Sequence, residues 1–159
     1  MKSRQIHKIL ILSGIAGIIG IVVFMVILQV DIARAQSFIE AYQNLIRDSR
    51  LLTQHYQSEI GKWKIKEYNN YTMISVTDHY LPEFQKIVKR AEMLHPPGKY
   101  SESLGLIIKS FNSEILSYKH FRIFLASGNQ AEDEKSTQLL SEALQYETRS
   151  FISFRAAST

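Results

Sequence analysis

The stretch ILILSGIAGIIGIVVFMVILQV, residues 9–30, is apolar throughout except for Ser13 and Gln29, and it carries no charge. As a helix rising about 1.5 Å per residue it would extend roughly 33 Å, which matches the hydrocarbon thickness of a bilayer. The run therefore predicts one N-terminal transmembrane helix. It leaves a short stub, residues 1–8, on one side of the membrane and residues 31–159 on the other.

The charges that flank this run indicate its orientation. Lys2, Arg4 and Lys8 precede it without any acidic residue, whereas Asp31 follows it directly. Positively charged flanks usually remain in the cytoplasm. We therefore expect a cytoplasmic stub and an extracytoplasmic C-terminal region, in a protein of the cell membrane that spans it once.

A cleaved signal peptide is the alternative interpretation of the same segment. Ala33, Arg34 and Ala35 form an A-x-A pattern, which would direct cleavage before Gln36. Signal peptides, however, have apolar regions of about 7 to 15 residues, shorter than this run. The length favours a retained anchor.

Small residues in the anchor are spaced to share one helix surface. Ser13 and Gly17 lie four positions apart, as do Ala16 and Gly20, and Gly14 lies nearby. Small side chains let two membrane helices approach closely, which favours packing against a partner subunit or a second copy. The alternative is that Gly and Ala are simply frequent in membrane helices.

Composition excludes several classes of function. Of the 19 Lys and Arg residues, three precede the anchor, while all 15 acidic residues follow it. The outer region is therefore nearly neutral and offers no basic surface for nucleic acid. The chain has no Cys, so disulfides, thiol catalysis and cysteine-based metal sites are excluded.

Apolar positions beyond the anchor recur at helical spacing, and no segment alternates as a strand does. The first seam comprises Phe38, Tyr42, Leu45, Ser49, Leu52 and Tyr56. No Gly or Pro separates this seam from the anchor, so one long helix is expected to continue to about residue 60. Further helices are expected over about 73–94, 101–127 and 132–154. The predicted buried stripe of the third helix comprises Leu104, Ile108, Phe111, Ile115, Tyr118 and Leu125, and the apolar positions of the last helix are Leu140, Ala143, Leu144, Phe151 and Phe154. We predict an all-α protein, in which the anchor is followed by an extracytoplasmic up-down four-helix bundle.

Turn residues mark the ends of these helices. A polar stretch, residues 61–70, predicts the first loop, and the run HPPGKY, residues 95–100, predicts the second. Ser101 is expected to cap the third helix, and Gly128 to end it in the left-handed conformation. Pro82 falls inside the second helix, where a kink or a restart near Tyr80 is expected.

Two candidate sites lie in the first loop. Trp63 is flanked by lysines and is either a contact for a partner or a side chain that closes the far end of the bundle. Asn70 begins an Asn-Tyr-Thr sequon, which predicts N-glycosylation if the cell glycosylates exported proteins. The second loop adds a further candidate contact for a membrane partner, comprising His95, Pro96 and Pro97.

Catalytic and metal-binding patterns are weak in this sequence. The five His residues show no spacing typical of a zinc or di-metal site. Met93 and His95 would supply only two copper ligands, and Asp78 with His79 would bind a ligand only if Pro82 exposed them. No nucleophile with a base, and no phosphate-binding loop, is evident. We expect a protein that is not an enzyme and has no cofactor.

The layout resembles small single-pass helical proteins of archaea and bacteria. The segments that carry this resemblance are residues 31–42, DIARAQSFIEAY, and residues 95–100, HPPGKY. In style the chain is similar to the accessory subunits of archaeal ammonia monooxygenase. That resemblance implies that copper and catalysis belong to other subunits, and it transfers no functional residue.

Two functional hypotheses follow. The first is a non-catalytic accessory or structural subunit of a membrane complex, for example one of the monooxygenase type. Such a subunit would contact other integral membrane subunits and the lipid bilayer. The second is an extracytoplasmic ligand-binding sensor or adaptor. A sensor would need a separate membrane partner, since only residues 1–8 lie in the cytoplasm.

Overall fold

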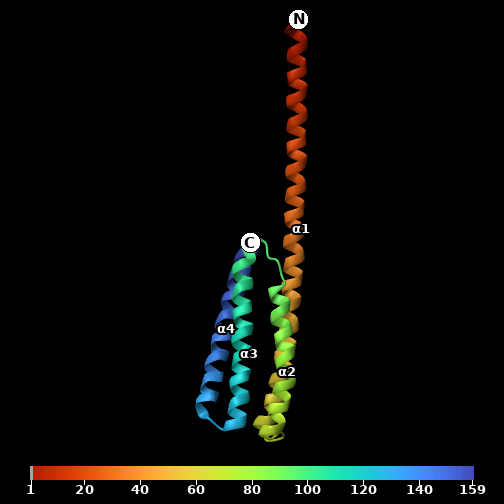
Figure 1. The fold of residues 1–159 in the computed structure, drawn as a ribbon. Coiled ribbons are helices and arrows are strands. Elements are labelled where there is room, and N and C mark those ends of the chain that lie inside the picture. Colours follow the sequence, from red (N-terminus) through yellow and green to blue (C-terminus); the bar gives the residue numbers. More distant parts are fainter. Residues whose placement is uncertain (1) are drawn as a thin grey trace. The chain divides into compact units, whose positions relative to one another are not determined.

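A computed structural model describes the backbone of residues 2–159 and the side chains of residues 32–159. The chain divides into two compact units, Met1–Ser37 and Phe38–Thr159. The described backbone is helical apart from its turns (Figure 1). Its elements are α1 (Lys2–Lys64), α2 (Asn70–Glu92), a short 3₁₀ turn η1 (Gly98–Tyr100), α3 (Ser101–Ser127) and α4 (Gln130–Ser158).

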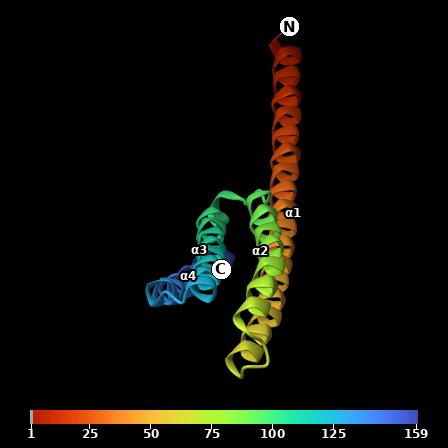
Figure 2. The same cartoon turned by 60° about the horizontal axis from the view of Figure 1, so that its bottom comes forward.

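The second unit is an antiparallel four-helix bundle, as the sequence predicts. The part of α1 beyond Ser37 runs beside α2, and α3 lies between α2 and α4 (Figures 1 and 2). Phe38 and Tyr100 pack with ring centroids 5.3 Å apart, which places the second loop at the end where α1 enters the bundle. Asn70 donates to the carbonyl oxygen of Leu125, which places the first loop beside the α3–α4 turn at the far end.

The first loop is shorter than the sequence predicts, because α1 continues through Gly61 to Lys64. The aromatic ring of Trp63 packs against α3, which favours one more helical turn at this point. Lys66, whose φ is 65°, then reverses the chain. Asn69 caps α2 by accepting the backbone N–H of Thr72, so this helix begins three residues earlier than expected.

The ends of α3 confirm one prediction and correct another. Gly128 adopts φ 70° and ends the helix in the left-handed conformation, as predicted. The prediction of a Ser101 cap is wrong, since Ser101 is already helical and η1 leads directly into α3. α2 runs through Pro82 as one continuous helix, so the predicted restart is absent.

Aromatic and apolar side chains fill the core of the bundle. Tyr56 is fully buried, lies with its ring centroid 4.5 Å from that of Tyr118, and packs edge-on against Phe84. At the end where α1 enters, Tyr42 stacks on Phe154 with a centroid separation of 4.6 Å. The predicted seam of the first helix is confirmed, because its members are buried apart from the half-buried Leu52.

A row of small side chains joins α3 to α4. Serines recur every seven residues on α3, at positions 103, 110 and 117, and each bonds to a residue of an antiparallel series on α4. The hydroxyl of Ser110 donates to the carbonyl oxygen of Ala143 at 2.8 Å, and the other two positions pair with Ser150 and Ser136. The heptad spacing keeps these contacts on one seam and lets the two backbones approach closely.

This seam shifts the buried face of α4 from the predicted one. Leu144, expected in the core, is 57% exposed, whereas Leu139 is buried. On α3 the predicted stripe is buried except at Ile108, which is half-buried, while the neighbouring Ile107 is buried. The serine contacts between α3 and α4 thus determine how α4 is rotated about its own axis. A pattern of large apolar residues in the sequence does not reveal this rotation.

In the part of the chain whose side chains the structure describes, no helix is both long and apolar enough to cross a bilayer. The side chains of the predicted anchor, residues 9–30, lie outside that part. The same holds for the predicted packing residues, which are Ser13, Gly14, Ala16, Gly17 and Gly20.

Candidate ligand site between α1 and α4

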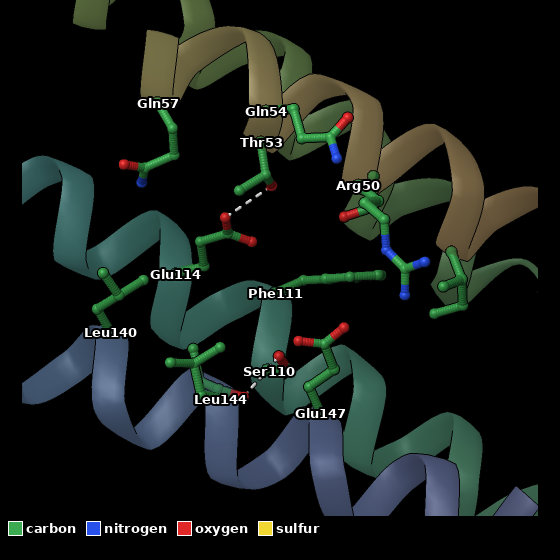
Figure 3. A pocket seen from close by; sticks show the side chains of 13 residues that line it. Arg50, Thr53, Gln54, Gln57, Ser110, Phe111, Glu114, Leu140, Leu144 and Glu147 are labelled. Carbon is green, nitrogen blue, oxygen red and sulfur yellow. Dashed lines mark hydrogen bonds between the residues drawn. The ribbon is translucent and has the colours of Figure 1, made fainter. Parts of the chain in front are cut away.

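A cavity of about 360 Å³ opens between α1 and α4, with α3 as its floor (Figure 3). This volume falls within the range of small-molecule sites. Its lining comprises Ile46, Ser49, Arg50, Thr53, Gln54, Gln57, Ser110, Phe111, Glu114, Leu140, Ala143, Leu144 and Glu147.

The cavity exists because three of the residues that face inward at this level are small. Ser49 of α1, Ser110 of α3 and Ala143 of α4 are all buried, and all line the cavity. Large residues at these positions would fill the space between the helices. Ser110 and Ala143 also belong to the α3–α4 seam, so the residues that draw these two helices together leave a gap toward α1.

Glu114 is the charged group deepest in the cavity. Its side chain rises from α3 and the residue is only 8% exposed. Two hydroxyl groups donate to the same carboxyl oxygen, Oε1: Thr53 of α1 at 2.8 Å and Tyr118 of α3 at 2.6 Å. Glu114 was not among the residues predicted from the sequence, although a Glu between Ser113 and Ile115 in an apolar helix is a recognisable signal.

The second oxygen of Glu114, Oε2, has no hydrogen-bond donor among the described residues. Every fully buried side-chain nitrogen or oxygen in that part of the chain has a partner, so Oε2 must be reachable from the cavity. In Figure 3 the carboxyl group points into the open space between α1 and α4. An acceptor in this position is available to a bound molecule.

Burial raises the pKa of the Glu114 carboxyl above its usual value. The hydroxyl groups of Tyr118 and Thr53 act in the opposite direction, because they stabilise the charged form, and the negative charge of Glu147 raises the pKa further. Glu114 therefore holds a proton more readily than an exposed glutamate does. A proton on Oε2 would leave both hydrogen bonds to Oε1 intact.

Opposite charges lie on the two walls nearer the mouth. Arg50 projects from α1 and Glu147 from α4, and both line the cavity (Figure 3). Arg50 is exposed and Glu147 is half-buried. Together these two groups contribute no net charge, which leaves Glu114 as the remaining charge of the site.

A second hollow of about 340 Å³ adjoins the first toward the end where α1 enters the bundle. The two share Ile46 and Arg50 in their linings. Aromatic rings of Tyr42, Phe151 and Phe154 contribute to the second hollow. The groove between α1 and α4 thus has a polar part around Glu114 and an aromatic part beside it.

Trp63 and Asn70 interact with each other and with α3. The Trp63 indole packs edge-on against Phe121 with centroids 5.3 Å apart, and its N–H donates to Oδ1 of Asn70 at 2.9 Å. The amide nitrogen of Asn70, which glycosylation would modify, donates to the carbonyl oxygen of Leu125 at 3.1 Å. Both side chains therefore take part in closing the far end of the bundle, and the sequon remains a prediction.

The second loop places its three candidate residues at the surface without drawing them into a cluster. His95 is exposed, while Pro96 and Pro97 are half-buried. Met93 is 65% exposed, at the C-terminal end of α2. Contact with a partner at this loop remains a prediction.

Asp78 forms an ion pair that the sequence did not reveal. Its carboxylate accepts two hydrogen bonds from Arg122 of α3, at 2.5 and 2.9 Å, and the pKa of Asp78 is lowered by that pairing. The residue thus links α2 to α3. His79 lies with its ring edge-on to Tyr80.

In the described part of the chain, no group of three or more His, Cys, Asp or Glu residues is placed to hold a metal ion.

Comparison of the chain with protein-family models, curated proteins and solved structures gives no match.

Proposed function

We propose that this chain is a membrane-tethered, non-catalytic binding module whose extracytoplasmic bundle holds a small molecule between α1 and α4. Glu114 is the observation that carries the proposal. It combines near-complete burial with one carboxyl oxygen that faces a cavity and has no donor among the described residues. Because Oε2 is accessible from the cavity, a ligand that donates to it would form a hydrogen bond with a carboxyl group, and such a bond is stronger than one between neutral groups when the carboxyl group is ionised.

The predicted anchor supports the tether in this proposal. Residues 9–30 are long and apolar enough, by sequence, to cross a bilayer, and Lys2, Arg4 and Lys8 favour a cytoplasmic N-terminus. The bundle would then lie outside the cell membrane.

An accessory subunit of a membrane complex is the second candidate function. It is favoured by the four-residue spacing of Ser13 with Gly17 and of Ala16 with Gly20, which suits close packing against another membrane helix. Replacing Gly17 and Gly20 with Leu should release such a partner while the helicity of the bundle is unchanged. Unchanged co-purification would contradict this candidate.

Native mass spectrometry tests the binding module directly. The full chain is extracted from its own membranes in mild detergent, and its mass is compared before and after collisional activation. A small molecule that leaves the protein on activation supports the proposal. Migration in a large assembly without any bound small molecule would favour the accessory subunit instead.

A cavity-filling variant assigns a bound molecule to this site. Ser49→Leu introduces a larger side chain into the cavity and should abolish retention of the molecule. Ser58→Leu is the matched control, because Ser58 is exposed on the same helix and does not line the cavity. Equal retention by the two variants would place the molecule elsewhere.

A further inference from the structure

We propose that the cavity between α1 and α4 takes a small organic monocation with an apolar body, such as an alkylammonium ion, whose N–H donates to Oε2 of Glu114. This inference rests on the proposed binding function and specifies its ligand class. It depends on three features of the site: its net charge, the single free acceptor and the apolar lining beside it.

The charge of the site favours a cation over an anion. Among the residues that line the cavity, Arg50 carries the positive charge, and Glu114 and Glu147 carry the carboxylates. Arg50 and Glu147 offset each other near the mouth, so an ionised Glu114 leaves one uncompensated negative charge. A monocation would neutralise it, whereas an anion would face both carboxylates.

The depth of Glu114 makes this interaction specific. Because the residue is 8% exposed, its charge is little screened by water. An ammonium N–H at Oε2 would form a charge-assisted hydrogen bond, stronger than one between neutral groups. Thr53 and Tyr118 hold the carboxyl group from the other oxygen, so it is oriented before a ligand arrives.

Apolar side chains next to Glu114 define the rest of the ligand. Phe111, Leu140 and Leu144 line the same cavity, and the adjoining hollow adds Phe151 and Phe154. A hydrocarbon chain of a few carbons would be removed from water when it packs against these side chains. Each buried methylene should strengthen binding about fourfold, until the chain exceeds the groove.

Binding of a cation should release a proton. Burial and Glu147 raise the pKa of Glu114, so the empty protein keeps a proton on this group to a higher pH than an exposed glutamate would. A bound cation favours the ionised form and expels that proton. The charged or titratable groups facing Glu114 are Arg50 of α1, Tyr118 of α3 and Glu147 of α4, while no described residue of α2 lines the cavity.

Calorimetric titration of the full chain in lipid nanodiscs, with empty nanodiscs as the blank, tests the proposal. The probes are n-butylammonium, n-hexylammonium, 1-butanol and butyrate. We expect saturable binding of both amines, tighter for the longer one, and binding of the alcohol and the carboxylate weaker by about tenfold or more, as loss of a charge-assisted hydrogen bond predicts. Repeating the titration in buffers of different ionisation enthalpy should reveal the released proton.

Three variants separate a ligand contact from a structural effect. Glu114→Gln keeps an oxygen for Thr53 and Tyr118 but removes the charge, and it should weaken amine binding about tenfold and abolish proton release. Glu147→Gln should weaken binding less, because Glu147 lies nearer the mouth. Glu134→Gln is the matched control on α4, exposed and outside the cavity, and should bind as the wild type does.

The outcomes distinguish this inference from the function on which it rests. No saturable amine binding, equal binding of 1-butanol, or full affinity in a helical Glu114→Gln protein would overturn the cation proposal. A neutral or anionic molecule retained in native mass spectra and lost in Ser49→Leu would overturn it while leaving the binding module intact. Absence of any retained molecule would contradict the binding module itself.

Discussion

At the scale of single residues, two pairs of core hydroxyl groups are arranged so that each hydroxyl proton has one acceptor. Thr77 donates to the carbonyl oxygen of Met73, so Tyr56 must be the donor in the 2.8 Å bond between their hydroxyl groups. The same reasoning makes Tyr42 the donor to Ser150, whose hydroxyl donates to the carbonyl oxygen of Ser103. Glu114 departs from this pattern because one of its oxygens faces a cavity.

In the Tyr56–Thr77 hydrogen bond, removing the acceptor, Thr77, should lower the stability of the bundle more than removing the donor hydroxyl of Tyr56. Thr77→Val leaves the buried Tyr56 hydroxyl without a partner and should lower the free energy of unfolding by about 1–3 kcal/mol. Tyr56→Phe leaves Thr77 bonded to Met73 and should cost about 0.5–1.5 kcal/mol through this bond. Chemical denaturation measures both, and Thr77→Ser, which keeps the hydroxyl, is the control. Equal effects of Thr77→Val and Thr77→Ser would contradict the assignment.

Glu114 should make the stability of the bundle depend on pH in a specific direction. Its pKa is raised in the folded state, so the folded protein binds this proton more tightly than the unfolded chain does. The stability that this group contributes is complete below its unfolded pKa and is lost as pH rises through its folded pKa.

Thermal unfolding from acid to neutral pH, compared between the wild type and Glu114→Gln, measures this dependence. The variant lacks the ionising group and should lose less stability as pH rises. Glu134→Gln serves as the control and should follow the wild type. A parallel pH profile for Glu114→Gln would show that Glu114 titrates with the same pKa in both states.

At the scale of helices, the ends are set by local backbone conformation and the faces by neighbouring helices. Asn69 and Asn129 cap α2 and α4 through their own side chains. The faces follow different rules, because the serine seam between α3 and α4 sets the rotation of α4 and leaves Leu144 exposed.

Two glycines should respond oppositely to the same substitution. A Cβ at either Gly61 or Gly128 would meet no atom within 4 Å, so only the backbone distinguishes them. Gly128→Ala forces a left-handed conformation at φ 70° and should cost about 1–2 kcal/mol. Gly61→Ala, inside α1, should stabilise by about 0.5–1 kcal/mol. Denaturant titration of both variants checks the signs, and a loss of stability in Gly61→Ala would contradict the helical assignment there.

At the scale of the whole molecule, the bundle has a core of its own. Phe38–Thr159 forms one compact unit with buried side chains contributed by all four helices. Its interhelical hydrogen bonds connect α1 to α2, α3 and α4 through Tyr56, Thr53 and Tyr42. These contacts do not require the predicted anchor.

The fragment that begins at Gln36 should therefore fold alone as a helical, cooperatively unfolding protein. Far-ultraviolet circular dichroism and thermal unfolding measure this, with the full chain in detergent as the comparison. A disordered fragment would show that the bundle depends on the anchor or on a partner.

The sequence by itself determined the helical class, the four-helix order and several boundaries. Period-three-and-four apolar spacing predicts helices regardless of context, and Gly128 ends α3 because its backbone conformation is a local property. From the sequence, Trp63 was either a contact for a partner or a side chain that closes the far end of the bundle. The sequence could not decide between these, because the packing of Trp63 on Phe121 joins positions far apart in the chain.

Only the tertiary structure decided the candidate site. Thr53, Glu114 and Glu147 come from three helices, and no local pattern relates them. The cavity arises because Ser49, Ser110 and Ala143 meet at one level, which depends on the relative rotation and register of the helices. Those quantities follow from the packing of side chains between helices, whereas helix formation and helix ends follow mainly from neighbours along the chain.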